Sequence, residues 1–314
     1  MLRGLFKLLL TLLITNYSYG ESNKSYLFVG HSYGSHSEMD YKIDPALESF
    51  INTNSLSFNN LILGGDFIYD CKNLFEYQNL LKLINQIDTR LVIGNHDSCD
   101  NIISIVKEKF KTINYYERID NNILFYLNTT IDDINPTNQL FEFISSTIDE
   151  EKPENVLIFT HQVIFSNSDF YLRSNSRKFY KYGNNLFNKL KNKFFKKDVN
   201  FYFFAGDIGA YKYTPYAFFD KEDNFQYYAV GLGNKIYDKA ISIDFSNGIN
   251  INFVDLNTSE IEDPKIYGKF SVQLYQLPKL LLFHIRSNLS VFIIIGSIAL
   301  YLLIIKIPKS VKKK

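Results

Sequence analysis

The chain has 314 residues, of which 46% are hydrophobic and 16% are aromatic. A chain of this length and composition can bury the core of one large globular domain. Its 34 Lys and Arg residues balance 33 Asp and Glu residues, which leaves a formal net charge of +1. This balance argues against a polyanionic partner, so no nucleic-acid binding is predicted.

The amino terminus predicts a signal peptide over residues 1–20. Arg3 and Lys7 precede a short apolar run over residues 8–14, and Ser18 and Gly20 place small side chains before the expected cleavage point. The apolar run is too short to cross about 30 Å of hydrocarbon as a helix. We therefore expect cleavage near Gly20 and export of the rest of the chain.

Residues 21–261 alternate short β-branched or aromatic runs with segments of helical spacing, which predicts an α/β domain. The final strands of this domain, at 226–230, 240–244 and 250–254, are expected to be consecutive antiparallel strands. The earlier predicted strands each end at a polar loop, and they cover residues 25–30, 60–64, 90–93, 123–128, 155–160 and 200–205.

The carboxyl-terminal end of the chain predicts a membrane anchor. A stalk over residues 262–286 leads to residues 287–305, which carry no charge and are rich in Ile, Leu, Val and Phe. At about 1.5 Å of rise per residue such a run can span a bilayer as a helix. The tail over residues 306–314 is rich in lysine, which indicates a cytoplasmic carboxyl terminus and an extracytoplasmic domain. The sequence thus predicts a single-pass membrane protein.

Polar side chains follow five of the predicted strands, and ligands in α/β folds bind beyond the carboxyl ends of strands. Carboxylate, amide and imidazole groups are also the donors that divalent metals prefer. The candidates, in chain order, are His31 and Tyr33, Asp66 and Tyr69, Asn95 with His96 and Asp97, His161, and Asp207.

The order of these motifs resembles that of the calcineurin-like metallophosphoesterases, which carry Asp-x-His, Gly-Asp, Gly-Asn-His-Asp/Glu, His and Gly-His-x-His. The third motif is complete in Gly94-Asn95-His96-Asp97, while Gly65-Asp66 and His161 stand in the family's order. The resemblance implies an αββα sandwich that holds one or two divalent metal ions of the Mn, Fe or Zn class.

The resemblance also implies roles for individual residues. Asp66 would bridge two metals, Asn95 and His161 would bind the second metal, and His96, oriented by Asp97, would contact the phosphate and assist the leaving group. The implied reaction is hydrolysis of a phosphoester, in which the metals polarise the phosphoryl oxygen and activate a water for attack on phosphorus.

The first and fifth motifs depart from the family pattern. His31-x-Tyr33 replaces Asp-x-His, and Gly206-Asp207-x-Gly209 replaces Gly-His-x-His. His31 and Asp207 still supply a donor each, whereas Gly209 offers none. Gly65-Asp66-x-x-Tyr69 matches a motif of the purple acid phosphatases, in which the tyrosine binds the first metal.

Two hypotheses follow: a membrane-anchored phosphoester hydrolase, or a catalytically weak or silent binding protein that keeps the fold.

Three further expectations concern single residues. Cys71 and Cys99 follow loops that the resemblance places on neighbouring strands, so a disulfide is expected, with two separate thiols as the alternative. Arg173 and Arg177 are candidates for binding a substrate phosphate. A serine esterase is a weaker alternative, because neither Ser32 nor Ser35 lies in a Gly-x-Ser-x-Gly motif.

Overall fold

The structure is a computed structural model that describes residues 24–34, 43–54, 58–130, 134–165, 172, 174, 180–209, 217–233 and 238–265. The predicted signal peptide, most of the stalk, the predicted membrane helix and the basic tail lie outside these ranges, as do Arg173 and Arg177. No helix within the described ranges combines the length and the apolar character that a bilayer crossing requires.

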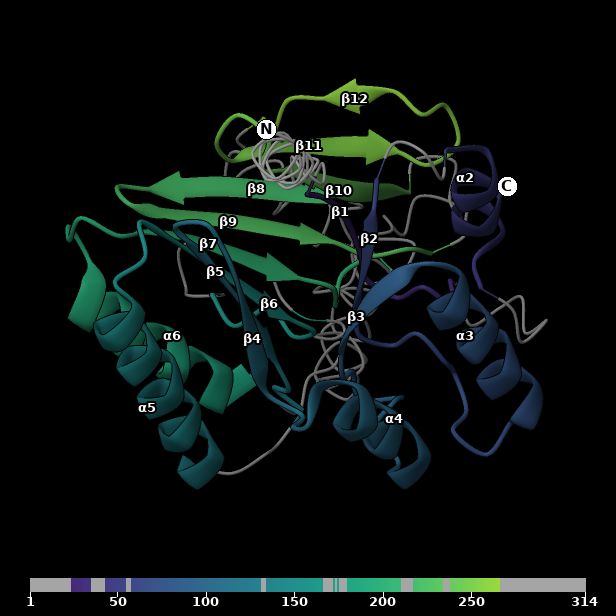
Figure 1. The fold of residues 1–314 in the computed structure, drawn as a ribbon, viewed down its shortest axis with the longest axis horizontal. Helices are drawn as coiled ribbons and strands as arrows, with labels where there is room; N and C mark the ends of the chain where they lie inside the picture. The colour runs from purple at the N-terminus through teal and green to yellow at the C-terminus, as the bar shows by residue number, and fades with distance from the viewer. Residues whose placement is uncertain are drawn as a thin grey trace, which may run out of the picture. The chain divides into compact units, whose positions relative to one another are not determined.

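Two six-stranded sheets form the centre of the domain (Figure 1). The first is built from β1 (Ser25–Val29), β2 (Asn60–Gly64), β3 (Asp88–Val92), β10 (Lys239–Asp244), β11 (Asn250–Asp255) and β12 (Ile261–Glu262). The second is built from β4 (Tyr115–Ile119), β5 (Asn122–Leu127), β6 (Asn155–Thr160), β7 (Asn200–Ala205), β8 (Ala217–Glu222) and β9 (Phe225–Val230).

The strand order is β12-β11-β10-β1-β2-β3 in the first sheet and β4-β5-β6-β7-β9-β8 in the second. In the first sheet β1, β2 and β3 are parallel, and in the second β5, β6, β7 and β9 are parallel. Antiparallel strands flank each parallel group. Both parallel groups are rich in buried aliphatic and aromatic residues, as strands covered on both faces require.

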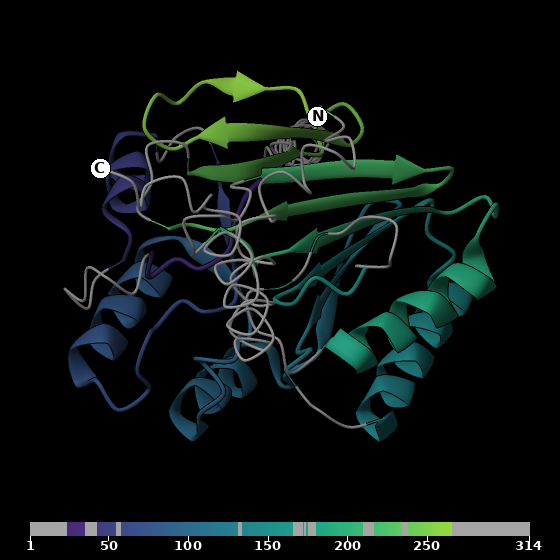
Figure 2. The same ribbon diagram turned by 180° about the vertical axis from the view of Figure 1, so that it is seen from behind.

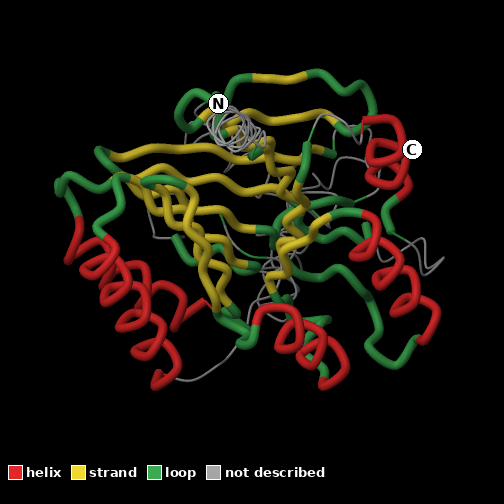
Figure 3. The backbone as a smooth tube through the Cα atoms, in the orientation of Figure 1, coloured by secondary structure: helices red, strands yellow, loops and turns green. Residues whose placement is uncertain are grey.

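Helices cover the outer faces of the sheets (Figures 1 and 2). Helices α5 (Ile134–Glu151) and α6 (Tyr180–Phe194) lie beside the second sheet, and α2 (Pro45–Asn54), α3 (Leu74–Gln86) and α4 (Asp100–Phe110) lie on the other side of the domain, next to β1–β3. Figure 3 shows the same succession of helical and strand layers. The domain is therefore a mixed α/β fold with two sheets between helical layers.

Alternating side chains of β7 show how the layers are held together. The ring of Phe204 lies 5.8 Å from that of Phe28 in the first sheet, whereas the ring of its neighbour Phe203 lies 5.5 Å from that of Phe187 in α6. Successive side chains of a strand point to opposite faces, so one strand contributes to the core between the sheets and to the core beneath the helices.

Two features differ from the sequence-based expectation. The strands β4, β8 and β12 were not predicted, and all three are edge strands with exposed or partly exposed residues. The last strands are also not a simple antiparallel run, because β9 belongs to the second sheet while β10 and β11 pair in the first. Alternation of polar and apolar residues indicates a strand, but it does not specify which of two sheets the strand joins.

Candidate metal centre

The candidate residues follow the carboxyl ends of parallel strands from both sheets. His31 follows β1, Asp66 follows β2, Asn95 follows β3, His161 follows β6 and Asp207 follows β7. All five come from loops at the same edge of their sheets, because the strands that carry them are parallel.

A glycine allows the two sheets to approach closely at this point. A Cβ atom placed on Gly206 would lie 2.0 Å from the carbonyl oxygen of Gly64, a separation that atoms do not adopt. Only glycine at this position lets the loop after β7 pass the end of β2. The close approach is what brings Asp207 of the second sheet to Asp66 of the first.

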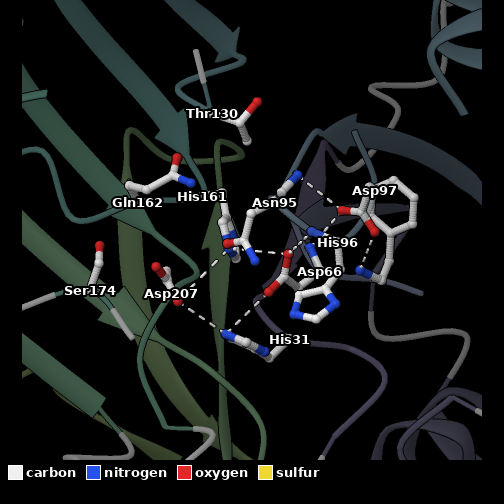
Figure 4. A network of polar contacts seen from close by, with 12 residues as sticks. His31, Asp66, Asn95, His96, Asp97, Thr130, His161, Gln162, Ser174 and Asp207 are labelled. Carbon is white, nitrogen blue, oxygen red and sulfur yellow. Dashed lines mark hydrogen bonds and ion pairs between the residues drawn. The ribbon is translucent and has the colours of Figure 1, made fainter. Parts of the chain in front are cut away.

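The side-chain donors converge on one another (Figure 4). His161 Nε2 lies 3.2 Å from Asn95 Oδ1, 3.3 Å from Asp66 Oδ1 and 3.8 Å from Asp207 Oδ1. His31 Nε2 lies 3.1 Å from Asp207 Oδ1 and 3.6 Å from Asp66 Oδ2. The structure thus brings together all five residues that the sequence singled out as metal ligands.

The orientation of His161 suits a metal ligand. Its Nδ1 lies 3.0 Å from the carbonyl oxygen of Gly64. Because a carbonyl oxygen only accepts, Nδ1 carries the proton and Nε2 is the nitrogen that faces the carboxylates. Metal-binding histidines are usually fixed in this way by a hydrogen bond from the second ring nitrogen.

The charges of the centre are strongly coupled. Burial lowers the pKa of His161, but the Asp66 and Asp207 carboxylates outweigh burial and raise that pKa to about 10. Burial raises the pKa of Asp66 and of Asp207, and in both cases the nearby imidazoles outweigh it and lower the pKa. At neutral pH the carboxylates of Asp66 and Asp207 therefore stabilise a positive charge that lies between them.

Two of the candidate residues have left-handed backbone conformations, with φ of 51° at His31 and 52° at Asp66. Residues other than glycine rarely adopt such values, and they do so at some cost in backbone energy. Both residues turn the chain sharply away from a buried strand, which directs their side chains into the centre.

The structure corrects the role expected for Asp97. Its carboxylate does not orient the His96 ring but accepts four backbone N–H groups: those of Asp66 (2.6 Å), Gly94 (2.9 Å), Phe67 (3.0 Å) and Ile68 (3.1 Å). Burial raises the pKa of this fully buried carboxyl, while the four donated hydrogen bonds stabilise its charged form. Asp97 therefore holds the loop that carries Asp66.

His96 is oriented by the backbone instead. Its Nδ1 donates to the carbonyl oxygen of Tyr69 at 2.9 Å, and its ring stacks on the Tyr69 ring at a centroid distance of 5.2 Å. Its backbone N–H donates to Asp66 Oδ1 at 3.0 Å. His96 thus lies next to the cluster of donors and not within it.

Tyr33 and Tyr69 contribute an aromatic wall beside the centre. The Tyr33 ring lies 5.4 Å from the His31 ring, 5.6 Å from the Tyr69 ring and 5.5 Å from the His96 ring. The Tyr69 N–H donates to Glu76 Oε2 of α3, which fixes the loop between β2 and α3. The contacts place both tyrosines near the centre, and a metal-binding role for either phenol stays a prediction.

Gln162, which directly follows His161, was not among the candidates from the sequence. Its side chain is buried, and Oε1 accepts a hydrogen bond from the Thr129 hydroxyl. Figure 4 labels Gln162 near His161. The Nε2 atom of Gln162 has no hydrogen-bond partner within the described part of the chain. Its only sequence signal was its position directly after His161.

The two cysteines form a disulfide with a Cα–Cα distance of 6.2 Å. Cys71 lies in the loop after Asp66, and Cys99 directly precedes α4. The bond therefore ties the loop of Asp66 to the loop of Asn95 and His96, which is the pairing expected from the sequence.

Replacing both cysteines with serine is expected to lower the free energy of unfolding by about 3 kcal/mol, because the open chain regains loop entropy in its unfolded state. Denaturant unfolding of the parent and the double variant measures the difference. A reductant should destabilise the parent and leave the double variant unchanged. Two reactive thiols in the denatured, unreduced parent would contradict the pairing.

The donor set fits a divalent metal ion on chemical grounds. Two imidazoles, two carboxylates and an amide oxygen are mixed nitrogen and oxygen ligands, and the four charged or ionisable side chains among them are buried. Within the described ranges, one group of three or more His, Cys, Asp or Glu side chains could hold a metal: His31, His161 and Asp207, with ligand atoms all within 4.8 Å of one another.

Comparisons with known proteins agree with this fold. No protein-family model and no curated protein sequence matches the chain. Among solved structures, the chain is similar to a purple acid phosphatase from yellow lupin (Lupinus luteus) seeds, with a TM-score of 0.53 and 12% identity, over 79% of this chain and 54% of that one. It is also similar to a dimetal phosphatase from Danio rerio, with a TM-score of 0.48 and 10% identity, over 73% of this chain and 94% of that one.

The chain therefore shares the two-sheet fold of that purple acid phosphatase. The chain spans about half the length of the purple acid phosphatase that it resembles. At such low identity the likeness establishes the fold, and the chemistry has to be argued from the side chains of this chain.

Proposed function

We propose that this protein is a metal-dependent phosphoester hydrolase. The observation that carries the proposal is the convergence of His31, Asp66, Asn95, His161 and Asp207, delivered by five strands of a metallophosphoesterase fold. A divalent metal bound there would supply a Lewis acid for the phosphoryl group and lower the pKa of a water molecule.

The residues of the chain have distinct tasks in this proposal. Asp66, Asn95, His161 and Asp207 would hold the metal, and Asp97 keeps the Asp66 loop in place through four hydrogen bonds. Because His96 Nδ1 donates to the Tyr69 carbonyl, Nε2 is the ring nitrogen that can contact a phosphate oxygen or give a proton to the leaving group.

We further propose that a carboxyl-terminal helix anchors the protein in a membrane, with the hydrolase domain on the extracytoplasmic side. The support comes from the uncharged apolar run over residues 287–305, the lysines that follow it and the signal-like amino terminus. The Cys71–Cys99 disulfide is in keeping with an oxidising compartment.

The alternative, a binding protein without activity, is favoured by one observation: the glycine at position 209, where the resemblance implies a metal-binding histidine. A direct assay separates the two. The full-length protein, loaded with Mn²⁺, Zn²⁺ or Fe²⁺, is tested on p-nitrophenyl phosphate, bis-p-nitrophenyl phosphate and a panel of natural phosphomonoesters and diesters.

We expect metal-dependent hydrolysis that a chelator abolishes and added metal restores. The Asn95→Ala variant, purified in the same way, should lack this activity, which excludes a contaminating phosphatase. No turnover on the whole panel by metal-loaded protein would sink the hydrolase proposal in favour of the binding protein.

A further inference from the structure

We infer that the centre binds a single divalent metal ion, with His31 as one of its ligands, rather than the pair of ions that the resemblance implies. This inference rests on the proposed metal-dependent function and concerns the same site. Three independent features of the structure support it: the spacing of the donor atoms, the backbone at Gly209, and the charge of the cluster.

Three of the four donor separations in the cluster match the spacing within one coordination shell, and the separation of His161 Nε2 from Asp207 Oδ1 is slightly longer. Ligand atoms bound to one ion by bonds of about 2.0 to 2.2 Å are separated from their neighbours by roughly 3 to 3.6 Å. His31 Nε2 lies 3.1 Å from Asp207 Oδ1 and 3.6 Å from Asp66 Oδ2. His161 Nε2 lies 3.3 Å from Asp66 Oδ1 and 3.8 Å from Asp207 Oδ1.

Both imidazoles therefore approach the same oxygen of Asp207, and each approaches one oxygen of Asp66. In sites with two ions, the ions are about 3.5 to 4 Å apart, and the ligands at opposite ends are farther apart still. The ligand atoms of His31, His161 and Asp207 instead lie within 4.8 Å of one another. These three side chains form one compact cluster.

The backbone at position 209 excludes a ligand side chain there. Gly209 has a φ of 92°, and a Cβ atom at this position would lie 1.8 Å from the carbonyl oxygen of Gly231. The loop after β7 has thus closed against the end of β9. A histidine could not be restored at position 209 without moving one of these two segments.

The exchange of histidine and aspartate between positions 31 and 207 also favours a single ion. Where the resemblance implies aspartate at position 31 and histidine at position 207, the chain has His31 and Asp207, and the two side chains face each other. His31 Nε2 thus faces Asp207 and Asp66, the same two carboxylates that His161 Nε2 faces. The two buried carboxylates, Asp66 and Asp207, match the charge of one divalent ion.

The test measures metal content and needs no turnover. The full-length protein is stripped with a chelator and titrated with Mn²⁺ by equilibrium dialysis, and the electron paramagnetic resonance spectrum is recorded at each step. We expect saturation at one Mn²⁺ per chain and the spectrum of an isolated ion. A second bound equivalent, accompanied by the spectrum of an exchange-coupled pair, would overturn the inference.

Variants assign the role of His31. His31→Ala is expected to weaken Mn²⁺ binding by at least about tenfold, since it removes a ligand. His96→Ala is the matched control, because His96 lies beside the donors and not among them, and it should bind Mn²⁺ as the parent does. Unchanged affinity in His31→Ala would also overturn the inference.

His31→Gln preserves much of the side-chain volume, so a matching loss of affinity in this variant excludes collapse of the fold as the cause. Two ions with hydrolysis would refute the inference and leave the hydrolase proposal intact. One ion without hydrolysis would support the inference and refute the hydrolase proposal.

Discussion

Turnover of a phosphoester is expected to fall at least about hundredfold when His96 is replaced by alanine, while the metal content stays that of the parent. The expectation follows from the geometry of the ring, which stacks on Tyr69 and donates through Nδ1 to the Tyr69 carbonyl. The ring is held beside the candidate metal ligands, so its loss should affect the chemical step more than metal binding.

The measurement compares kcat, KM and metal affinity of the parent and the variant. Ser98→Ala is a suitable control, because Ser98 lies in the same loop and is exposed. Its kcat should match that of the parent. An unchanged kcat in His96→Ala, in a preparation that is active and loaded with metal, would count against a catalytic role for His96.

Replacing Asp97 with alanine should produce the largest loss of stability of any single change in the centre. The substitution leaves four buried backbone N–H groups without their acceptor: those of Asp66, Gly94, Phe67 and Ile68. Removing a buried carboxylate that is paired in this way costs about 3 to 5 kcal/mol. For a domain of this size the Tm should fall by roughly 6 to 15 °C.

Differential scanning calorimetry of the metal-free proteins measures this effect without a contribution from bound metal. Asp149→Ala is the matched control, since Asp149 is exposed and its contact is an ion pair with Lys193 at the surface. That change should alter stability by about 0.5 kcal/mol or less. A Tm for Asp97→Ala within about 2 °C of the parent would refute the structural role of Asp97.

The largest part of the fold could be predicted because the signal was local. The strands β1, β2, β6 and β7 begin and end within one residue of the predicted ranges, since each is a buried apolar run bounded by a polar loop. The edge strands β4 and β8 lack such a run, because each has exposed or partly exposed positions. Their strand character comes from the neighbour with which each pairs.

The residues that the structure brings together could be predicted from the sequence, but some of their contacts could not. The residues could be found because oxygen and imidazole donors stand where buried strands end, in the order of a known family. The role of Asp97 could not be found in this way, because its partners are backbone N–H groups of a different loop, and backbone groups carry no sequence signal. The same is true of the Tyr69 carbonyl that orients His96.

The sequence by itself therefore determined which candidate residues stand at the ends of which strands, and it led to the expected pairing of Cys71 with Cys99. The tertiary structure alone decided that Gly206 brings the two sheets together at Gly64, and that position 209 has no space for a side chain. It also decided that His31 meets Asp207 across the two sheets. The physical reason is that propensity and spacing act along the chain, whereas these features depend on distances of a few ångströms between segments far apart in sequence.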